Sequence, residues 1–99
     1  MNKFRAIVMK ANDNVATVVE PLSQGTTIDL SVGGELVSVK VAEQIPFCHK
    51  FAIKEIAQGD QIIKYGEVIG LATQPIHVGQ HVHIHNLESC RGRGDKEPA

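Results

Sequence analysis

Short runs of apolar residues alternate with turn-forming residues along most of this chain. The runs recur about every 8 to 12 residues, and no stretch of about 12 or more residues keeps an apolar period of 3.6. This spacing is typical of a β domain rather than a helical one. We therefore expect an all-β, wound structure of about six to eight short strands.

Three hairpins are predicted from the residues that separate these runs. The expected strand pairs are 4–9 with 15–19, 26–30 with 35–41, and Gln61–Lys64 with 67–71. The turn at Gly33-Gly34 requires positive φ, and Tyr65-Gly66 forms another tight connection. The valines of segment 35–41 alternate with polar residues, so we expect them to face the core. A single helical turn is credible at one place, residues 51–56.

Three histidines alternate with two β-branched residues near the end of the chain. His81, His83 and His85 are separated by Val82 and Ile84, and residues of these types favour a strand over a helix. In a strand over 81–85 the imidazoles share one face, and Val82 and Ile84 face the core. Neighbouring imidazoles are then about 6.6 to 7 Å apart and can share one metal ion, whereas His81 and His85 are about 13 Å apart. A strand with an exposed polar face is the plain alternative, and it stays open.

Composition limits the classes of partner. The chain has 99 residues, 42% of them hydrophobic and 21% charged, which suits one small domain. Its net charge of −1 provides no basic field for nucleic acid or for an anionic membrane, so we expect neither as a partner. Cys48 and Cys90 form no Cys-x-x-Cys motif, and neither a signal peptide nor a long apolar run is evident. We expect a cytoplasmic protein.

Nearly the whole chain resembles a known family, most densely over residues 48–95, while the first 45 residues fit by hydrophobic pattern. The residues that carry the resemblance are Cys48-His-Lys-Phe-Ala52, Gly59, Ile63-Lys-Tyr-Gly66, Val68-Ile-Gly70, Ala72, Ile76, Gly79, His81-Val-His83, His85-Asn86 and Arg91-Gly-Arg-Gly-Asp95. They are similar to the SAF domain of altronate and galactarate dehydratases, with sulfolactate sulfo-lyase among the relatives. The resemblance implies a SAF-type β-clip fold over residues 1–90, followed by a flexible Arg/Gly tail or linker over 91–99.

The chain departs from the family pattern at two points. The family usually has glycine immediately before the His-Lys pair, where this chain has Cys48. A side chain at this position suggests that the backbone there has no strict need for positive φ. The second departure is length, because a fused dehydratase would continue far beyond residue 99. We therefore expect either a separate small subunit or a fragment.

The resemblance also implies site residues. The candidate catalytic residues are His49, His83 and His85, the candidate substrate-binding residues are Lys50, Asn86, Arg91 and Arg93, and the candidate metal ligands are His83 and His85. Arginine suits a sugar-acid carboxylate because its planar fork binds carboxylates in a bidentate manner. Plain alternatives remain open: a structural His49, a solvated Lys50, and arginines that anchor the tail to a partner.

The family reaction is the β-elimination of water from a polyhydroxy acid. It needs a base, an acid and a cation that stabilises the enediolate, and the family uses iron(II) or manganese for the last role. The resemblance thus implies a divalent metal and a sugar-acid substrate in the complete enzyme. We expect this chain to be an accessory half, inactive alone, that forms a site with a larger catalytic dehydratase subunit or domain.

Three other readings stay open. The chain is alternatively a non-catalytic SAF binding or assembly module, the small subunit of a sulfolactate sulfo-lyase, or a metal carrier that uses its histidine strand. The sequence leaves open whether it forms a homo-oligomer.

Overall fold

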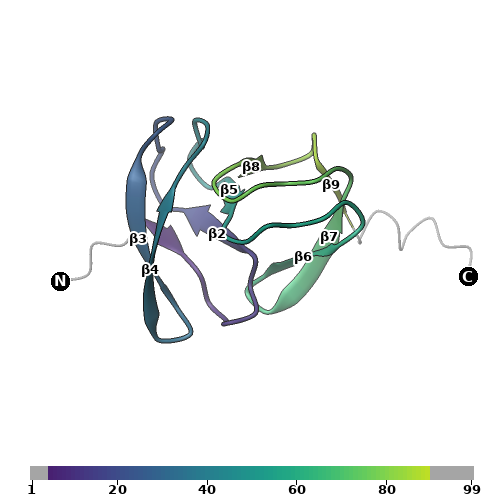
Figure 1. Ribbon diagram of the computed structural model, residues 1–99, viewed down its shortest axis with the longest axis horizontal. Coiled ribbons are helices and arrows are strands. Elements are labelled where there is room, and N and C mark those ends of the chain that lie inside the picture. Colours follow the sequence, from purple (N-terminus) through teal and green to yellow (C-terminus); the bar gives the residue numbers. More distant parts are fainter. Residues whose placement is uncertain (1–4, 90–99) are drawn as a thin grey trace, which may run out of the picture.

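The computed structural model describes residues 5–89, and these form nine short β-strands and no helix (Figure 1). The all-β expectation is therefore confirmed for the described part of the chain. The strands are β1 (Ala6–Ile7), β2 (Val15–Val18), β3 (Thr27–Val32), β4 (Glu35–Lys40), β5 (Lys50–Ala52), β6 (Gln61–Lys64), β7 (Glu67–Ala72), β8 (His81–Val82) and β9 (Leu87–Ser89).

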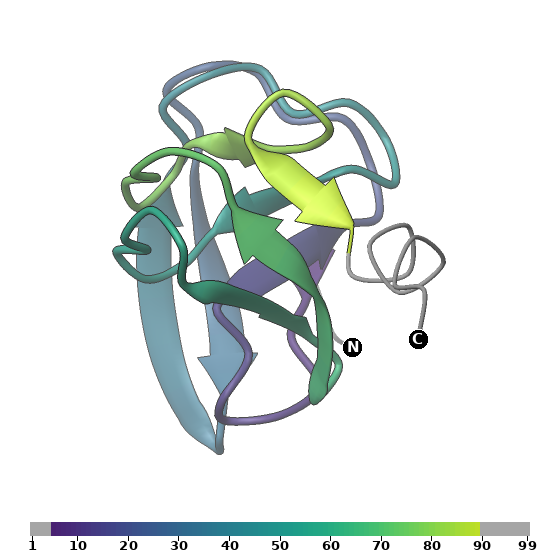
Figure 2. The same ribbon diagram turned by 90° about the vertical axis from the view of Figure 1, so that its right-hand side faces the viewer.

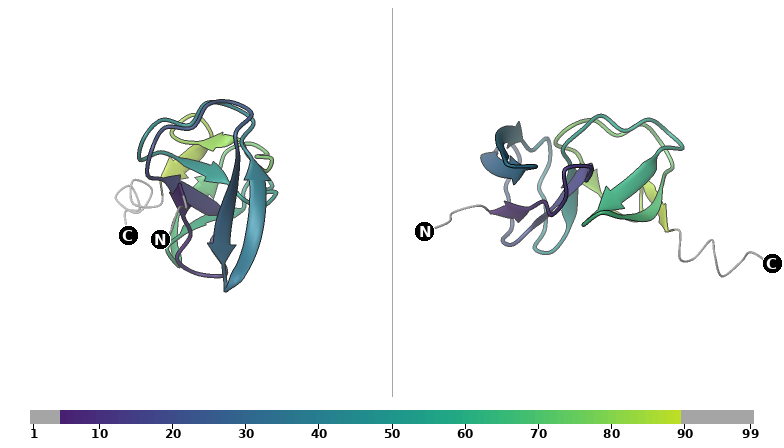
Figure 3. Two further views of the ribbon diagram at one scale, coloured as in Figure 1. Left: turned by 90° about the vertical axis from the view of Figure 1, so that its left-hand side faces the viewer. Right: turned by 90° about the horizontal axis from the view of Figure 1, so that it is seen from below.

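The strands form three small antiparallel sheets. The four-stranded sheet has the order β1-β2-β5-β8, the second sheet is the hairpin β3-β4, and the third has the order β6-β7-β9. The four-stranded sheet lies in the middle in Figure 1, between the hairpin and the three-stranded sheet. Figure 2 shows the three-stranded sheet from its own side, and Figure 3 shows the hairpin from the opposite side.

The middle sheet separates two apolar cores, because alternate residues of its strands face opposite ways. Phe51 pairs with Ala16 and His81 in register, and Lys50 pairs with Val82 on the other face. The core on the Phe51 face comprises Ala6, Ala16, Val18, Leu22, Ile28, Leu30, Val39, Val41, Ile45, Phe51 and Ile53. The core on the Val82 face comprises Val15, Ala52, Ile56, Ile62, Ala72, Ile76 and Val82. Complete burial of a side chain such as Phe51 contributes about 1.5 to 3 kcal/mol.

Four turns of the same geometry connect these layers. We name them turn A (23–26), turn B (46–49), turn C (57–60) and turn D (77–80). In each turn the N–H of the fourth residue donates to the carbonyl of the first, at 3.0 or 3.1 Å. The residue just before each turn is a buried aliphatic, and these are Leu22, Ile45, Ile56 and Ile76. The third residue of each turn has positive φ, and these are Gly25 (88°), Cys48 (70°), Gly59 (90°) and Gly79 (90°).

Each turn is tied to a strand residue by two reciprocal backbone hydrogen bonds. The N–H of the positive-φ residue donates to the strand carbonyl, and the N–H of that strand residue donates to the carbonyl of the fourth turn residue. These residues are Val41, directly after β4, for turn A, and the strand residues Val18 for turn B, Ala72 for turn C and Ala52 for turn D, with distances between 2.8 and 3.3 Å. Isolated bridges between Leu22 and Ile45 and between Ile56 and Ile76 pair turn A with B and turn C with D. The described chain is thus built from one turn unit used four times.

Two of the predicted hairpins are confirmed closely. The β3-β4 turn contains Gly33 and Gly34 at φ 58° and 87°, and the β6-β7 turn contains Tyr65 and Gly66 at φ 57° and 79°. Among the valines of segment 35–41, Val39 and Val41 are buried in the core. The N-terminal pair also forms, as β1 with β2, although residues 1–4 lie outside the described part of the chain.

The expected helical turn is wrong. Residues 51–56 contain the end of strand β5 and the bridging residue Ile56. Strand pairing explains the difference, because Phe51 has ladder partners on both sides, Ala16 and His81. Tertiary pairing here overrides a weak local preference. The proposed boundary between the domain 1–90 and the tail 91–99 lies outside the described residues.

The equivalent turns allow a matched test of packing. Gly25 and Gly79 occupy the same turn position with nearly the same φ, but a Cβ on Gly25 would meet no heavy atom within 4 Å. A Cβ on Gly79 would overlap the carbonyl oxygen of Lys40 and lie 3.1 Å from the Ala42 nitrogen. We expect Gly25→Ala to cost about 1 kcal/mol of unfolding free energy and Gly79→Ala about 2 to 4 kcal/mol. Urea unfolding of both variants measures this, and equal losses would contradict the close approach of turn D to the end of β4.

Candidate functional site

Three imidazoles gather at one end of the middle sheet. The rings of His49 and His83 stack with centroids 4.1 Å apart, and the His81 ring lies 5.1 Å from the first and 5.4 Å from the second. Nδ1 of His49 and Nε2 of His81 are 2.9 Å apart. One ring nitrogen of each histidine lies within 4.8 Å of the others, and all three residues are partly buried. We call His49, His81 and His83 the histidine cluster.

Strand register explains the clustering. Strands β5 and β8 are antiparallel, with Phe51 opposite His81 and Lys50 opposite Val82. One further step along the ladder brings His49 opposite His83, just beyond the last paired residues. Because residues two apart on a strand share a face, all three imidazoles lie on the same face as Phe51.

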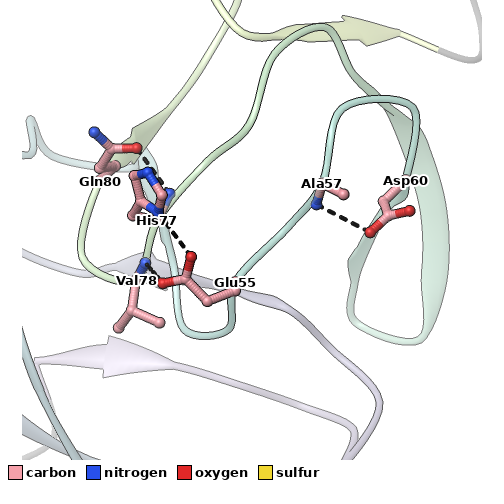
Figure 4. A network of polar contacts seen from close by, with 6 residues as sticks. All are labelled: Glu55, Ala57, Asp60, His77, Val78 and Gln80. Carbon is pink, nitrogen blue, oxygen red and sulfur yellow. Dashed lines mark hydrogen bonds and ion pairs between the residues drawn. The ribbon is translucent and has the colours of Figure 1, made fainter.

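In three of the four turns, the side chain of the fourth residue bonds to its own turn. Thr26 donates through Oγ1 to the Ser23 carbonyl at 2.7 Å. In turns C and D the fourth side chain accepts the N–H of the first residue, Asp60 from Ala57 at 3.0 Å and Gln80 from His77 at 2.8 Å (Figure 4). These side chains therefore serve the turn itself.

Turn B is the exception, and it supplies His49. Its first residue is Pro46, which has no N–H for a side chain to accept. The His49 ring instead forms its contact with His81 at 2.9 Å. The proline thus removes the local partner that holds the fourth residue in turns C and D, and leaves the imidazole for the cluster.

Asn86 fixes the other side of the cluster. It is only 4% exposed, and its Oδ1 accepts the N–H of His83 at 2.9 Å while its Nδ2 donates to the carbonyl of His81 at 2.9 Å. Its own N–H donates to the His83 carbonyl at 3.1 Å. Sequence reasoning placed Asn86 on the substrate, but both polar atoms of its side chain hold the backbone. The geometry makes it a positioning residue.

The expected strand over 81–85 is wrong beyond Val82. Strand β8 ends there, and the Asn86 hydrogen bonds close residues 83–86 into a turn. Ile84 is consequently 83% exposed instead of buried. The His85 ring lies 5.4 Å from the His81 ring instead of about 13 Å, yet His85 is outside the group of metal-ligating side chains found among residues 5–89. His83 of the proposed metal pair therefore belongs to the cluster, and its partners are His49 and His81.

The interpretation of Cys48 is also wrong. Its φ is 70°, in the position that glycine occupies in the other three turns. The turn requires positive φ, and a residue with a Cβ adopts it here at a steric cost of about 1 to 2 kcal/mol. The Cys48 thiol is free and exposed, next to His49 in sequence.

Burial and neighbouring positive groups lower the pKa of two imidazoles of the cluster, those of His81 and His83. Burial lowers the pKa of His81, with further lowering from His49, His85 and His83, against a smaller raising effect of Glu43. Burial and the neighbouring His49, Lys50 and His85 lower the pKa of His83. Neutral rings carry the lone pairs that metal ions and protons require.

Lys50 lies near the cluster on the Val82 face of the ladder. Burial and the positive charge of Lys64 lower its pKa, and it contributes in turn to the lowered pKa of His83. A partly buried ammonium next to another lysine is suited to bind a carboxylate, because an anion relieves the repulsion. The proposed arginines Arg91 and Arg93 lie outside the described residues.

The fifth histidine has a different role. His77 contacts Glu55 through Nδ1 at 2.7 Å, and Glu55 also accepts the Val78 N–H at 3.0 Å (Figure 4). Both side chains are about two-thirds exposed, at 67% and 66%. This exposed ion pair holds turn D to the segment before turn C and makes His77 a control for the cluster.

The cluster can hold a metal ion or move a proton. Two imidazole nitrogens that bind the same ion at about 2.0 to 2.1 Å, with a right angle between the two bonds, are about 2.9 Å from each other. Nδ1 of His49 and Nε2 of His81 are also 2.9 Å apart. Three imidazoles suit iron or zinc and leave coordination positions open for the oxygen ligands that manganese also takes. Without an ion, one of the two imidazoles donates its N–H to the other. The contact between His49 and His81 was not predicted from the sequence. The signal that could have helped is the aliphatic-x-x-Gly spacing of the turns, which recurs along the chain.

The described residues contain no helix long and apolar enough to span a membrane.

Comparison with known proteins gives consistent matches. The family model for the altronate/galactarate dehydratase SAF domain matches residues 4–90. Altronate dehydratases of Escherichia coli (strain K12) and Bacillus subtilis (strain 168) are 41% and 35% identical over 83 residues, which is 84% of this chain. The match covers 16% of each of these enzymes, so the chain spans only about a sixth of their length.

A third relative differs in size. The (2R)-sulfolactate sulfo-lyase subunit alpha of Chromohalobacter salexigens is 35% identical over 88 residues, which is 86% of this chain and 94% of that subunit. The same domain therefore occurs within a much longer chain in some relatives and makes up nearly a whole subunit in another.

The lowered pKa values of His81 and His83 predict a pH-dependent stability. Since both folded-state values lie below the unfolded value of about 6.5, the unfolded chain binds more protons, and stability falls as pH drops below about 6.5. We expect a lower Tm at about pH 5.5 than at about pH 7.5 for the chain in EDTA, and a smaller difference for His81→Gln. Thermal unfolding checks this, with His77→Gln as the control. An unchanged pH dependence in His81→Gln would contradict the assignment.

Proposed function

The chain belongs to the altronate/galactarate dehydratase SAF-domain family, and we propose that it is the accessory component of a carbohydrate-acid dehydratase. The complete enzyme eliminates water from a sugar acid. The observation that carries this proposal is the histidine cluster, three partly buried imidazoles whose ring nitrogens lie within 4.8 Å of one another at the end of the middle sheet.

The cluster supplies only part of what an elimination needs. The reaction requires a base for the proton next to the carboxylate, an acid for the leaving hydroxyl, and a positive charge that stabilises the enediolate. No carboxylate of the described residues joins the imidazoles as a metal ligand. A larger catalytic domain or subunit therefore completes the site, in line with the 16% of altronate dehydratase that the match covers.

Each residue takes a role that its position supports. His49, His81 and His83 would hold a divalent ion, iron(II) or manganese, which would supply Lewis-acid stabilisation of the developing negative charge. Lys50 binds the substrate carboxylate, and His85, exposed beside His81, exchanges protons with the substrate. Arg91 and Arg93 remain predicted carboxylate ligands. An exposed free thiol at Cys48 suits the reducing cytoplasm in which we place the enzyme.

A second candidate is the small subunit of a sulfolactate sulfo-lyase. The coverage of 94% of the subunit alpha from C. salexigens favours it, because the two chains are nearly coextensive in the match. Sulfite would then be the leaving group instead of water, while the roles of the cluster and Lys50 would stay the same.

A chimera tests the proposed function. Residues 1–99 replace the matched segment of E. coli altronate dehydratase, and dehydration of altronate is assayed with added manganese or iron(II). We expect turnover by the chimera, none by the isolated chain, and a loss of at least about 100-fold in the His49→Ala and His83→Ala chimeras. His77→Ala is the matched control and should retain activity.

Two outcomes of this assay would count against the proposal. Turnover by the isolated chain would show that no larger partner is needed. Full activity of the His49→Ala and His83→Ala chimeras would show that the cluster has no part in the reaction.

Metal binding by the isolated chain is tested separately from activity. We expect one Mn²⁺ per chain in an electron paramagnetic resonance titration, with affinity reduced at least about tenfold in His49→Ala and His83→Ala because each removes one nitrogen ligand. His77→Ala should bind like the unchanged chain. Equal affinity in all three variants would place the ion elsewhere.

A further inference from the structure

Ile84 is the most exposed large apolar residue of residues 5–89, at 83%. It lies in the turn 83–86, which Asn86 fixes through three hydrogen bonds to His81 and His83. Single apolar residues on a surface need no explanation by themselves. This one is held in place between His83 and His85, at the edge of the histidine cluster.

Phe47 is a second exposed apolar residue at this site, 58% exposed. It is the second residue of turn B. Turns A and C have Gln24 and Gln58 at the same position and turn D has the smaller Val78, 39% exposed, so the turn itself does not require a large apolar side chain. The large aromatic residue occurs in the turn that supplies His49 to the cluster.

Phe47 and Ile84 leave the same end of one strand pair. Strand β5 begins at Lys50 and β8 ends at Val82, and these two residues are paired. The segments before β5 and after β8 therefore start side by side, as the 4.1 Å separation of the His49 and His83 rings confirms. Phe47 lies two residues before His49, and Ile84 directly follows His83.

We propose that this end of the β5-β8 ladder is a docking surface for the larger catalytic part of the enzyme, with Phe47 and Ile84 as its apolar anchors. The proposal rests on the proposed function, which requires such a partner. In the altronate dehydratases the match covers 16% of the chain, so most of each enzyme lies outside the match and is available to cover this surface. Aromatic residues are enriched in the buried part of protein interfaces, and a few residues there carry most of the binding energy.

The chemistry of the occupant follows from the cluster. The described residues at the site offer nitrogen ligands, whereas iron(II) and manganese also take oxygen ligands. The facing surface of the catalytic part therefore carries carboxylate or carbonyl oxygens at its centre. Apolar pockets beside these oxygens accept the side chains of Phe47 and Ile84. Docking would complete the metal site and exclude water from it.

Cys48 is a built-in reporter of this docking. Its thiol is exposed and lies between Phe47 and His49. The isolated chain and the altronate dehydratase chimera are each treated with iodoacetamide, and mass spectrometry of the peptide that contains Cys48 gives the rate of alkylation. Both samples contain EDTA, so that a bound metal ion does not affect the rate. We expect alkylation at least about tenfold slower in the chimera. Equal rates would overturn the docking surface.

Matched substitutions identify the anchors. Phe47→Ser combined with Ile84→Ser should restore most of the Cys48 reactivity in the chimera without unfolding it, because both side chains are exposed. Leu36→Ser removes an equally exposed leucine, 69% exposed, from the separate β3-β4 hairpin and should leave Cys48 protected. Protection that survives the double substitution would overturn the role of the two residues as anchors.

The same samples separate the two proposals. An active chimera with unprotected Cys48 would overturn the docking surface and leave the proposed function standing. A chimera that protects Cys48 but does not dehydrate altronate would support the docking surface and count against the proposed dehydratase function.

Discussion

The described part of this domain depends on one interaction, the reciprocal pair of backbone hydrogen bonds between a turn and a strand residue. It occurs four times, each time with a positive-φ residue three positions after a buried leucine or isoleucine. Each pair satisfies four polar backbone groups next to the core, two N–H and two C=O, which would otherwise be costly to bury. In turn D the pair ties Gly79 and Gln80 to Ala52 of β5, and β8 begins with the next residue, His81. This constraint therefore brings β5 beside β8.

The histidine cluster follows from that placement and from two local exceptions. Pro46 deprives turn B of the N–H that the fourth side chain accepts in turns C and D, so the His49 ring forms its contact across the ladder. Asn86 then ends β8 and orients His83 through the backbone. A small domain thus presents three imidazoles on one surface. The proposed division of labour with a larger partner would explain why this domain occurs within much longer chains in some relatives and makes up nearly a whole subunit in another.

The parts of the fold that local chemistry determines could be predicted from the sequence. Gly33-Gly34 and Tyr65-Gly66 identified their hairpins because positive φ limits the residues that fit. The predicted strand over 81–85 was wrong because alternation of residue types shows which side chains share a face only while the chain stays extended. The turn at Asn86 depends on its hydrogen bonds to His81 and His83, which the sequence does not reveal. His49 could not be placed beside His83, since that contact depends on the register of two strands that are distant in sequence. The four turns could have been recognised from their aliphatic-x-x-Gly spacing, but Cys48 replaces the glycine in one of them. Arg91 and Arg93 lie outside the described residues.

The central claim is that His49, His81 and His83 form one site for a divalent ion. A crystal structure of the chain soaked in manganese, with data collected at the manganese absorption edge, tests it most directly. The account predicts one anomalous peak within about 2.0 to 2.3 Å of a ring nitrogen from each of the three histidines. An anomalous peak at His77 and Glu55 instead would contradict the account. So would a structure in which the three imidazole rings are separated and no anomalous peak lies near them.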